Sequence, residues 1–278
     1  MCSYMLWFSR FGAACVALLL ALSASSAARS DTVVDLELVL AVDVSLSMDI
    51  EEQRLQRDGY VAALRDPQVL TAIQSGHHGQ IAIAYMEWAG PYSQATVLSW
   101  TIINGKETAE EVAQKLEAAP ISRRRMTSIS SALEYAGKLL ESNPYRGLRR
   151  VIDISGDGPN NSGPPVTPIR DRLVEEGVVI NGLPVFIRPS QSSLFDISYL
   201  DRYYADCVIG GPGSFMIPIR DKSEFATATR QKLILEISGL QHLPRIVPAQ
   251  FVGNEDEKTN CMIGEQLWRR YMDDRIRN

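Results

Sequence analysis

The sequence predicts an α/β fold with a doubly wound, mostly parallel central sheet and helices on both faces. Short apolar stretches rich in β-branched residues alternate with longer amphipathic stretches through most of the 278 residues. Strands that alternate with helices form parallel sheets joined by right-handed crossovers. The strand segments are continuously apolar, as expected where both faces of a sheet are covered. No proline- or serine-rich linker divides the chain, so we expect one α/β domain.

The first expected strand is the apolar half of residues 39–48, VLAVDVSLSM. Its run of β-formers is short enough for a buried parallel strand. Apolar runs with the same character follow along the chain, one of which (96–103) is β-branched and aromatic. The further strands are expected at 80–88, 96–103, 149–155, 178–187 and 214–219.

Helices are expected between these strands, where apolar residues recur at intervals of three or four. Asp66-Pro67 is expected to close the first helix, because proline disfavours helical conformation in the residue before it. Pro120 lies beyond the end of the second helix, and Gly177 ends a later one. The helices are expected at 49–64, 107–118, 128–140, 168–176, 200–209 and 225–237.

Residues 1–28 have the pattern of a secretory signal peptide. Arg10 stands in an otherwise uncharged lead, an apolar run extends from Phe11 to Leu22, and small residues follow up to Ala28. This order of segments is typical of a signal that is removed after export. The apolar run is too short to favour a membrane span, and the alternative is an uncleaved N-terminal anchor. We therefore expect a periplasmic or secreted protein with no stable membrane span after cleavage.

The composition bears on partners and on cysteine chemistry. The net charge is −5, and a mildly acidic chain is a poor candidate for nonspecific nucleic-acid binding. Cys207 and Cys261 remain once the signal is removed, and an even pair in an oxidising compartment favours a disulfide. That bond would dock a C-terminal extension, residues 241–278, onto a domain at residues 31–240.

Three polar clusters lie at or near the ends of expected strands. Asp43, Ser45 and Ser47 end the first strand, Thr127 precedes the helix at 128–140, and Asp157 follows the strand at 149–155. Singly, Thr127 is explained as a helix cap and Asp157 as a turn residue. Open α/β sheets bind ligands beyond the carboxyl ends of their strands, so we expect the three clusters to meet at that edge. Such hard oxygen donors suit Mg²⁺, with Mn²⁺ as the other candidate.

The segment 43–47, DVSLS, matches the D-x-S-x-S motif of von Willebrand factor type A domains. Thr127 and Asp157 follow in the order in which that family places the other parts of its metal-ion-dependent adhesion site. The chain resembles this family from Val33 to about Gly239. The segment 152–161, IDISGDGPNN, resembles a bacterial group of exported, uncharacterised type A proteins.

The resemblance implies a site that docks a partner and is not catalytic. Ser45, Ser47 and Thr127 would be hydroxyl ligands, directly or through water, while Asp43 and Asp157 would accept hydrogen bonds from bound waters and hydroxyls. An ion with few anionic ligands keeps much of its charge and attracts a carboxylate from another molecule. The chain is therefore expected to be a non-enzymatic binding protein that docks Asp or Glu of a partner protein through Mg²⁺.

The alternative is a Mg²⁺-dependent phosphohydrolase of the haloacid dehalogenase type. These enzymes also place an Asp after a buried strand, and they require a second Asp two residues later as acid and base. Here Ser45 occupies that second position, and Asn161 stands where an acidic ligand would be expected. An assay with phosphate esters separates the two functions.

Two segments near these clusters carry further hypotheses. Residues 123–125 are three consecutive arginines, explained either as a solvated loop or as a group that orients an acidic partner. A disulfide between Cys207 and Cys261 would enclose the helix at 225–237. It would either pin a loose tail or hold the segment 267–271 against the domain and limit the travel of that helix.

Overall fold

The computed structural model describes residues 32–187, 197–239 and 259–277. The signal peptide expected at residues 1–28 lies outside them. Within the described residues, none of the helices has both the length and the apolar character that crossing a membrane requires.

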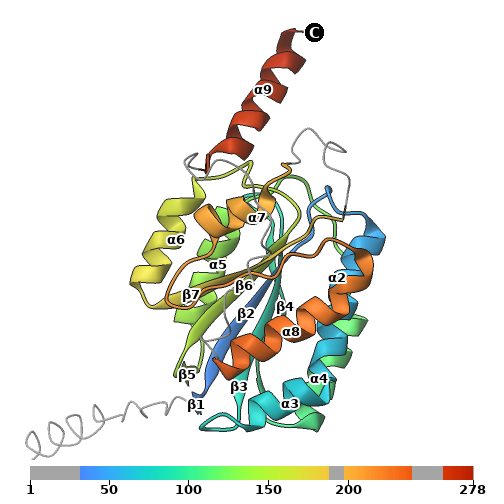
Figure 1. Ribbon diagram of the computed structural model, residues 1–278, viewed down its shortest axis with the longest axis vertical. Coiled ribbons are helices and arrows are strands. Elements are labelled where there is room, and N and C mark those ends of the chain that lie inside the picture. Colours follow the sequence, from blue (N-terminus) through green and yellow to red (C-terminus); the bar gives the residue numbers. More distant parts are fainter. Residues whose placement is uncertain (1–31, 188–196, 240–258, 278) are drawn as a thin grey trace, which may run out of the picture. The chain divides into compact units, whose positions relative to one another are not determined.

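A five-stranded sheet in the order β4-β3-β2-β6-β7 lies at the centre of the fold (Figure 1). All neighbouring pairs are parallel except β3 and β4, which are antiparallel. β2 and β3 are buried along their whole length, which accounts for their continuous apolar sequences. The strands are β2 (Leu36–Asp43), β3 (Ile81–Trp88), β4 (Gln94–Ile103), β6 (Arg150–Gly156) and β7 (Val178–Pro184). β1 (Thr32–Val34) and β5 (Tyr145–Gly147) pair separately, at the lower end in Figure 1.

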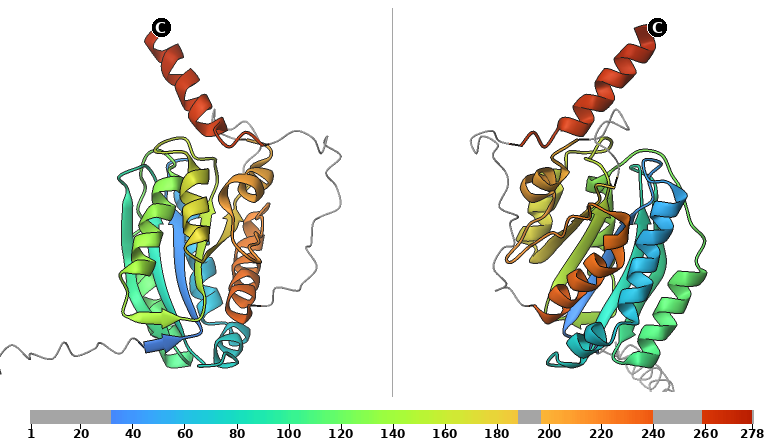
Figure 2. Two further views of the ribbon diagram at one scale, coloured as in Figure 1. Left: turned by 90° about the vertical axis from the view of Figure 1, so that its left-hand side faces the viewer. Right: turned by 45° about the vertical axis from the view of Figure 1, so that its right-hand side comes forward.

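Helices cover both faces of the sheet, as Figure 2 shows, so the predicted fold class is confirmed. Along β2, Leu38 and Leu40 face one helical layer and Val39 and Ala41 the other. One layer contains α2 (Ile50–Leu64), α3 (Pro67–Gln74), α4 (Lys106–Ala118) and α8 (Phe225–Ser238). The other contains α5 (Ile129–Glu141), α6 (Val166–Glu175), α7 (Leu200–Tyr203) and the π-helical turn η1 (Tyr204–Val208).

The end of the first helix is as predicted, but the helix that follows it was not foreseen, and one predicted strand was wrong. Asp66-Pro67 does follow the end of α2, but it also starts α3: the Asp66 side chain accepts a hydrogen bond from Gln68 N, and proline suits the first helical position. The segment 214–219 is not a strand. It runs beside β7 through isolated bridges, because Pro184 lacks the N–H that would bond to Ile217 in a continuous ladder.

Near its C-terminus the chain forms α9 (Ile263–Arg277), a helix that was not predicted from the sequence. Cys261, just before this helix, forms a disulfide with Cys207 of η1, and their Cα atoms are 5.5 Å apart. The predicted bond is therefore present. Gly264 in the first turn of α9 is buried, whereas Arg269 and Arg270 further along are exposed.

A buried ion cluster joins α8 to the centre of the sheet. Lys232 Nζ lies 2.8 Å from Oδ1 of Asp153 in β6, and it also pairs with Glu236 one turn later on α8. Asn181 of β7 donates a hydrogen bond to Glu236 at 3.0 Å. Burial, followed by the charge of Asp153, raises the pKa of Glu236 from 4.5 to about 7, against the opposing effect of Lys232. The cluster therefore binds a proton that the unfolded chain releases near pH 4.5.

The difference between the pKa of Glu236 in the folded and the unfolded state predicts how stability depends on pH. Between pH 5 and 8 the folded state holds the Glu236 proton more tightly than the unfolded state, so the free energy of unfolding falls as the pH rises. Over that range we expect the wild type to lose on the order of 2–3 kcal/mol relative to Glu236→Gln, which has no such proton. Urea unfolding of both proteins at a series of pH values measures the difference. Parallel pH profiles would contradict the proposed protonation of Glu236.

Candidate metal centre

The D-x-S-x-S segment leaves the sheet at the end of β2, where the strand order reverses between β3 and β6. Asp43 is the last residue of β2, and its Oδ1 accepts a hydrogen bond from Ser45 N at 2.7 Å. Ser45 Oγ lies 2.6 Å from Ser47 Oγ, and Ser47 Oγ donates to Asp157 Oδ1 at 2.6 Å. A continuous chain of hydrogen bonds thus joins four of the five predicted site residues, across 110 positions of sequence.

Thr127 is brought to the same edge by its backbone. Its N–H donates to Asn161 Oδ1 and its carbonyl accepts from Asn161 N, both at 2.9 Å. The loop that contains Thr127 also reaches β2, because Arg124 forms a β-bridge with Ser45. The side chain of Thr127 is 4% exposed. The loop is therefore tied to both of the other clusters, at the upper end of the sheet in Figure 1.

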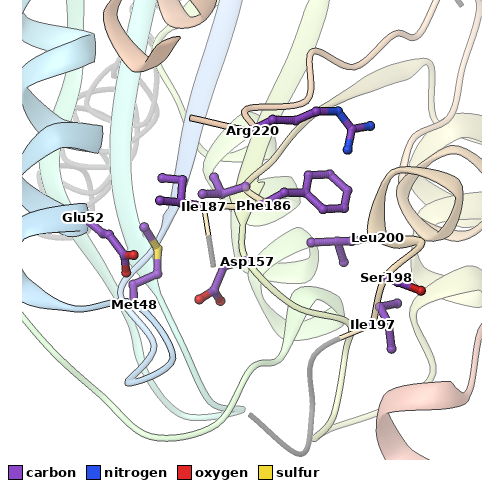
Figure 3. A pocket seen from close by; sticks show the side chains of 10 residues that line it. Met48, Glu52, Asp157, Phe186, Ile187, Ile197, Ser198, Leu200 and Arg220 are labelled. Atoms are coloured by element: carbon purple, nitrogen blue, oxygen red, sulfur yellow. The ribbon is translucent and has the colours of Figure 1, made fainter. Parts of the chain in front are cut away.

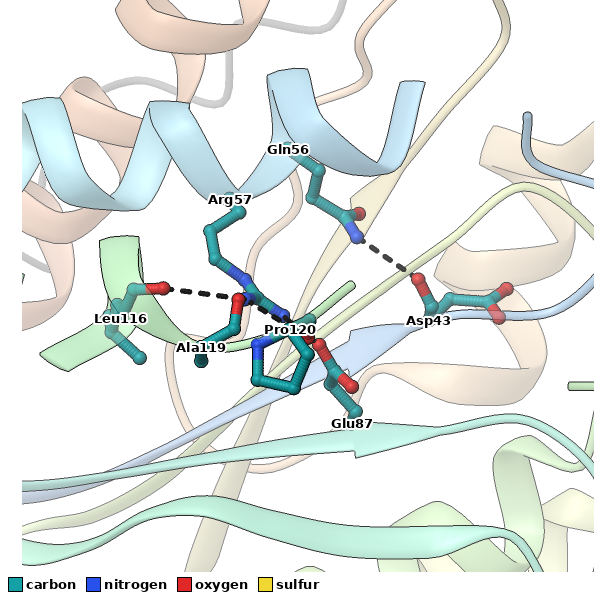
Figure 4. A network of polar contacts seen from close by, with 7 residues as sticks. All are labelled: Asp43, Gln56, Arg57, Glu87, Leu116, Ala119 and Pro120. Carbon is teal, nitrogen blue, oxygen red and sulfur yellow. Dashed lines mark hydrogen bonds and ion pairs between the residues drawn. The ribbon is translucent and has the colours of Figure 1, made fainter. Parts of the chain in front are cut away.

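Two side chains of α2 donate hydrogen bonds to the backbone of the D-x-S-x-S motif. Gln56 Nε2 donates to the carbonyl oxygen of Asp43 at 3.1 Å, as Figure 4 shows. Gln53 Nε2 donates to the carbonyl oxygen of Ser45 at 3.3 Å. Both glutamines are buried, although long amides are usually exposed. These bonds account for the burial of the two glutamines. Because they go to backbone carbonyl oxygens, they fix the end of β2 without using the serine hydroxyls.

A neighbouring ion pair fixes α2 itself. The guanidinium of Arg57 pairs with Glu87 of β3, and both side chains are 4% exposed. Arg57 Nη1 also donates to the carbonyl oxygens of Leu116 (3.3 Å) and Ala119 (2.6 Å), at the end of α4 (Figure 4). Burial raises the pKa of Glu87, while the charge of Arg57 opposes the shift. Arg57 thus connects α2, β3 and α4 directly behind the motif.

The site concentrates negative charge in a buried setting. Burial, and then the charge of Asp157, raise the pKa of Asp43 well above its ordinary value. Asp43 Oδ2 and the hydroxyl oxygen of Tyr204 are both buried without a hydrogen-bond partner among the described residues. A Cβ on Gly156 would lie 3.0 Å from the first of these atoms and 2.9 Å from the second, so both border a space that glycine leaves open. Two unsatisfied oxygens in one space are unusual in a folded core.

This donor set fits a hard divalent cation. The hydroxyls of Ser45 and Ser47 are flanked by two carboxylates, one of which keeps an unsatisfied oxygen, and a bound cation would stabilise that arrangement. In the part of the chain that the structure describes, no three His, Cys, Asp or Glu side chains are grouped to hold a metal. The case for a metal therefore depends on hydroxyl oxygens, and the ligand set stays a prediction.

Asn160, whose role was not predicted from the sequence, connects the loop after Asp157 to α5, α7 and α9. Its Oδ1 accepts from Ser130 N at 3.1 Å, and its backbone N donates to the Tyr203 hydroxyl at 3.2 Å. Its Nδ2 donates to Glu265 Oε1 at 2.6 Å, in the first turn of α9. A Cβ on Gly264 would lie 2.0 Å from the carbonyl oxygen of Asn160. The start of the tail helix is thus packed against the loop that carries Asp157.

A cavity of about 230 Å³ opens beside Asp157 (Figure 3). Met48 and Glu52 lie on one side of Asp157, with Phe186 and Leu200 on the other. Arg220 also lines the cavity; its guanidinium lies 4.7 Å from the centre of the Phe186 ring and pairs with Asp201 at 2.7 Å. The cavity beside Asp157 is therefore lined by both apolar and charged side chains.

The tie between Thr127 and Asn161 can be tested directly. We expect Asn161→Ala to remove the acceptor for Thr127 N–H, to lower the free energy of unfolding by about 1–2 kcal/mol, and to speed hydrogen exchange at that amide. Ser99→Ala, an exposed change on β4, is the control and should leave both quantities unchanged. Unaltered protection of the Thr127 amide in Asn161→Ala would show that other contacts hold the loop.

Comparison with protein families gives one match over most of the chain. The family described as "Protein of unknown function (DUF1194)" matches residues 33–241. Comparison with curated protein sequences finds no significant match.

Solved structures share the fold at low sequence identity. Proximal thread matrix protein 1 from the mussel byssus, in a structure described as having a zinc-occupied MIDAS motif, is 14% identical with a TM-score of 0.56, covering 75% of this chain and 49% of that one. The pilus adhesin SpaC from Lactobacillus rhamnosus GG, in an open conformation, is 10% identical with a TM-score of 0.55 (73% and 30%). A von Willebrand factor type A structure from Catenulispora acidiphila is 13% identical with a TM-score of 0.51 (73% and 43%). The chain spans half or less of each of these proteins.

Proposed function

The chain belongs to the DUF1194 family and has the von Willebrand factor type A fold, and on this basis we propose that it is a binding protein that docks its partner through a divalent cation. The observation that carries the proposal is the hydrogen-bonded chain from Ser45 through Ser47 to Asp157, beside the unsatisfied oxygen of Asp43. Hydroxyls and carboxylates from two distant loops meet where parallel sheets bind ligands. The mussel protein whose MIDAS motif holds zinc supports a divalent cation in this kind of site.

Each residue has a distinct part in the proposed site. Ser45, Ser47 and Thr127 would contribute neutral hydroxyl oxygens, and Asp43 and Asp157 would accept hydrogen bonds from these hydroxyls and from bound water. The cation, when bound, supplies a positive charge with an exchangeable coordination position. Mg²⁺ suits this set of hard oxygens best, with Mn²⁺ as the second candidate.

The partner that such a site recognises is a protein that presents Asp or Glu. A carboxylate matches the charge and hardness of the cation, and the surrounding loops offer the exposed Arg124 and Arg125. The phosphohydrolase alternative gains no support from the structure. Ser45 stands where that mechanism needs an acid, and its hydroxyl contacts Ser47. We therefore propose a function without catalysis.

We also propose that the protein is exported and that its C-terminal extension is docked onto the domain. The signal-like pattern at residues 1–28 and the disulfide between Cys207 and Cys261 both support an oxidising compartment outside the cytoplasm. In this proposal residues 31–240 form the type A domain, and residues 241–278 form an extension that the disulfide holds near Asn160.

Metal binding has a direct thermodynamic consequence. Millimolar Mg²⁺ should raise the melting temperature of the wild type, because a ligand of the folded state alone stabilises it by about 2.7 kcal/mol at a hundredfold excess over Kd. Asp43→Ala and Asp157→Ala should fold and lose this increment. Glu51→Ala, an exposed carboxylate outside the site, should keep it. Equal increments in the wild type and in both aspartate variants would place the metal elsewhere.

The disulfide should contribute both to stability and to docking. The bond closes a loop that spans 54 positions. Its removal should lower the free energy of unfolding by about 4 kcal/mol in the chain-entropy model. We expect the Cys207→Ser/Cys261→Ser double variant to unfold at lower urea concentration and to exchange amide hydrogens faster in α9. If the bond also limits the travel of α8, metal-dependent affinity for a partner should change as well. A looser tail with unchanged affinity would make the bond purely structural.

A further inference from the structure

Large apolar side chains are exposed around the candidate metal centre. Leu46 stands between the two serines of the motif, Met126 directly precedes Thr127, and Tyr92 lies in the turn between β3 and β4. Of the eight large apolar side chains that are exposed in the described residues, four lie at this edge of the sheet. Single exposed apolar residues are ordinary, but a group around one site indicates an interaction surface. The four are Leu46, Ile50, Tyr92 and Met126.

Three of these side chains come from loops that contact one another. Arg124 N donates to the carbonyl oxygen of Val44 at 2.9 Å, which joins the Met126 loop to the motif that carries Leu46. A Cβ on Gly90 would lie 3.2 Å from Cβ of Met126, so the turn with Tyr92 packs against the same loop. Leu46, Tyr92 and Met126 are called the apolar rim below.

Met126 has a backbone conformation that methionine rarely adopts. Its φ of 71° is the only positive value among the non-glycine residues that the structure describes. This region favours glycine or asparagine, so methionine here costs stability. The side chain is 40% exposed and gains little from packing in return. A strained, exposed apolar residue beside a ligand position indicates a role in binding.

The arginines next to the rim divide into two kinds. Arg123 Nη2 donates to the carbonyl oxygens of Leu46 (3.2 Å) and Met48 (2.8 Å), so this guanidinium holds the motif loop. Arg124 and Arg125 are exposed. The sequence hypothesis was that residues 123–125 all orient an acidic partner. The structure leaves Arg124 and Arg125 as the candidates for that role. Their positive charge complements an acidic partner.

We propose that the apolar rim, with Arg124 and Arg125, recognises a protein segment in which the acidic residue that reaches the metal stands next to a large apolar side chain. The inference rests on the proposed metal-dependent docking and specifies its partner. A purely acidic ligand would use the cation and the arginines alone. The rim is removed from water only when the ligand brings an apolar group, and that burial would add affinity and selectivity.

The test is selection of short random peptides displayed on phage. The oxidised protein is immobilised in millimolar Mg²⁺, and bound phage are released with a chelator. The inference expects the released peptides to carry Asp or Glu with Leu, Ile, Phe, Tyr or Trp enriched at adjacent positions. Acidic peptides without that enrichment would overturn the inference and leave the proposed docking intact. Failure to obtain any chelator-released peptide would contradict the metal-dependent docking and the inference with it.

Variants of the rim then assign the apolar preference to these residues. Met126→Gly removes the side chain and relieves the strained φ, so its melting temperature should equal or exceed that of the wild type. Its Kd for a selected peptide, measured by fluorescence anisotropy, should nevertheless rise about tenfold. Tyr92→Ser should weaken binding in the same direction. Leu148→Ser, a change of another exposed apolar residue, before β6 at the far end of the sheet, is the control and should alter neither value. Unchanged peptide affinity in both rim variants would place the apolar contact elsewhere and overturn the inference.

Discussion

Two carboxylates that repel each other are held together at one edge of the sheet, and much of the structure serves this constraint. Asp43 is fully buried at the end of β2, and Asp157 directly follows β6, the strand that pairs with β2. Burial and the proximity of Asp157 both disfavour the charged form of Asp43. The hydrogen bond from Ser45 N to Asp43 offsets part of this cost, and a bound cation would offset more of it. The same feature that destabilises the metal-free site therefore prepares it for a metal.

The surroundings of the two carboxylates explain how they are kept in place. Gln53 and Gln56 fix the motif from α2, and Arg57 fixes α2 against β3 and α4. On the other side, Asn160 joins the Asp157 loop to α5, α7 and α9. Buried hydrogen bonds of this kind, each between a side chain and a neighbouring element, restrain the backbone around them. A rigid frame allows neutral hydroxyls to serve as ligands, because little ordering remains to be done when the ion binds.

The C-terminal part of the chain reaches the site by two routes. The disulfide anchors α9 to η1, the turn that also carries Tyr204 beside Asp43. Glu265 in the first turn of α9 bonds to Asn160 in the loop after Asp157. The ion cluster of Lys232, Asp153 and Glu236 separately fixes α8 on the opposite face. The disulfide and the Glu265–Asn160 bond thus both connect α9 to the edge of the sheet where the candidate site lies.

The sequence was most informative where function depends on local pattern. Asp43, Ser45 and Ser47 follow an apolar strand at fixed spacing, and Asp157 lies between glycines after another, so their meeting followed from the rule for parallel sheets. Thr127 was placed by family order, and its tie to Asn161 was not foreseen. Gln53, Asn160 and Tyr204 carry no local signal, because their roles arise only when distant segments pack. The predicted strand at 214–219 failed because its apolar composition said nothing about Pro184 of the neighbouring β7, which lacks the N–H that a continuous ladder needs.

The most direct test of the central claim is anomalous diffraction from crystals grown with Mn²⁺. Mn²⁺ accepts the same oxygen ligands as Mg²⁺ and gives an anomalous signal that locates it. The account predicts one strong peak within coordination distance of Ser45 Oγ and Ser47 Oγ, with Asp43 and Asp157 beside it and with water or a foreign carboxylate completing the coordination. A crystal with no peak at this edge, or with its only peak elsewhere, would contradict it.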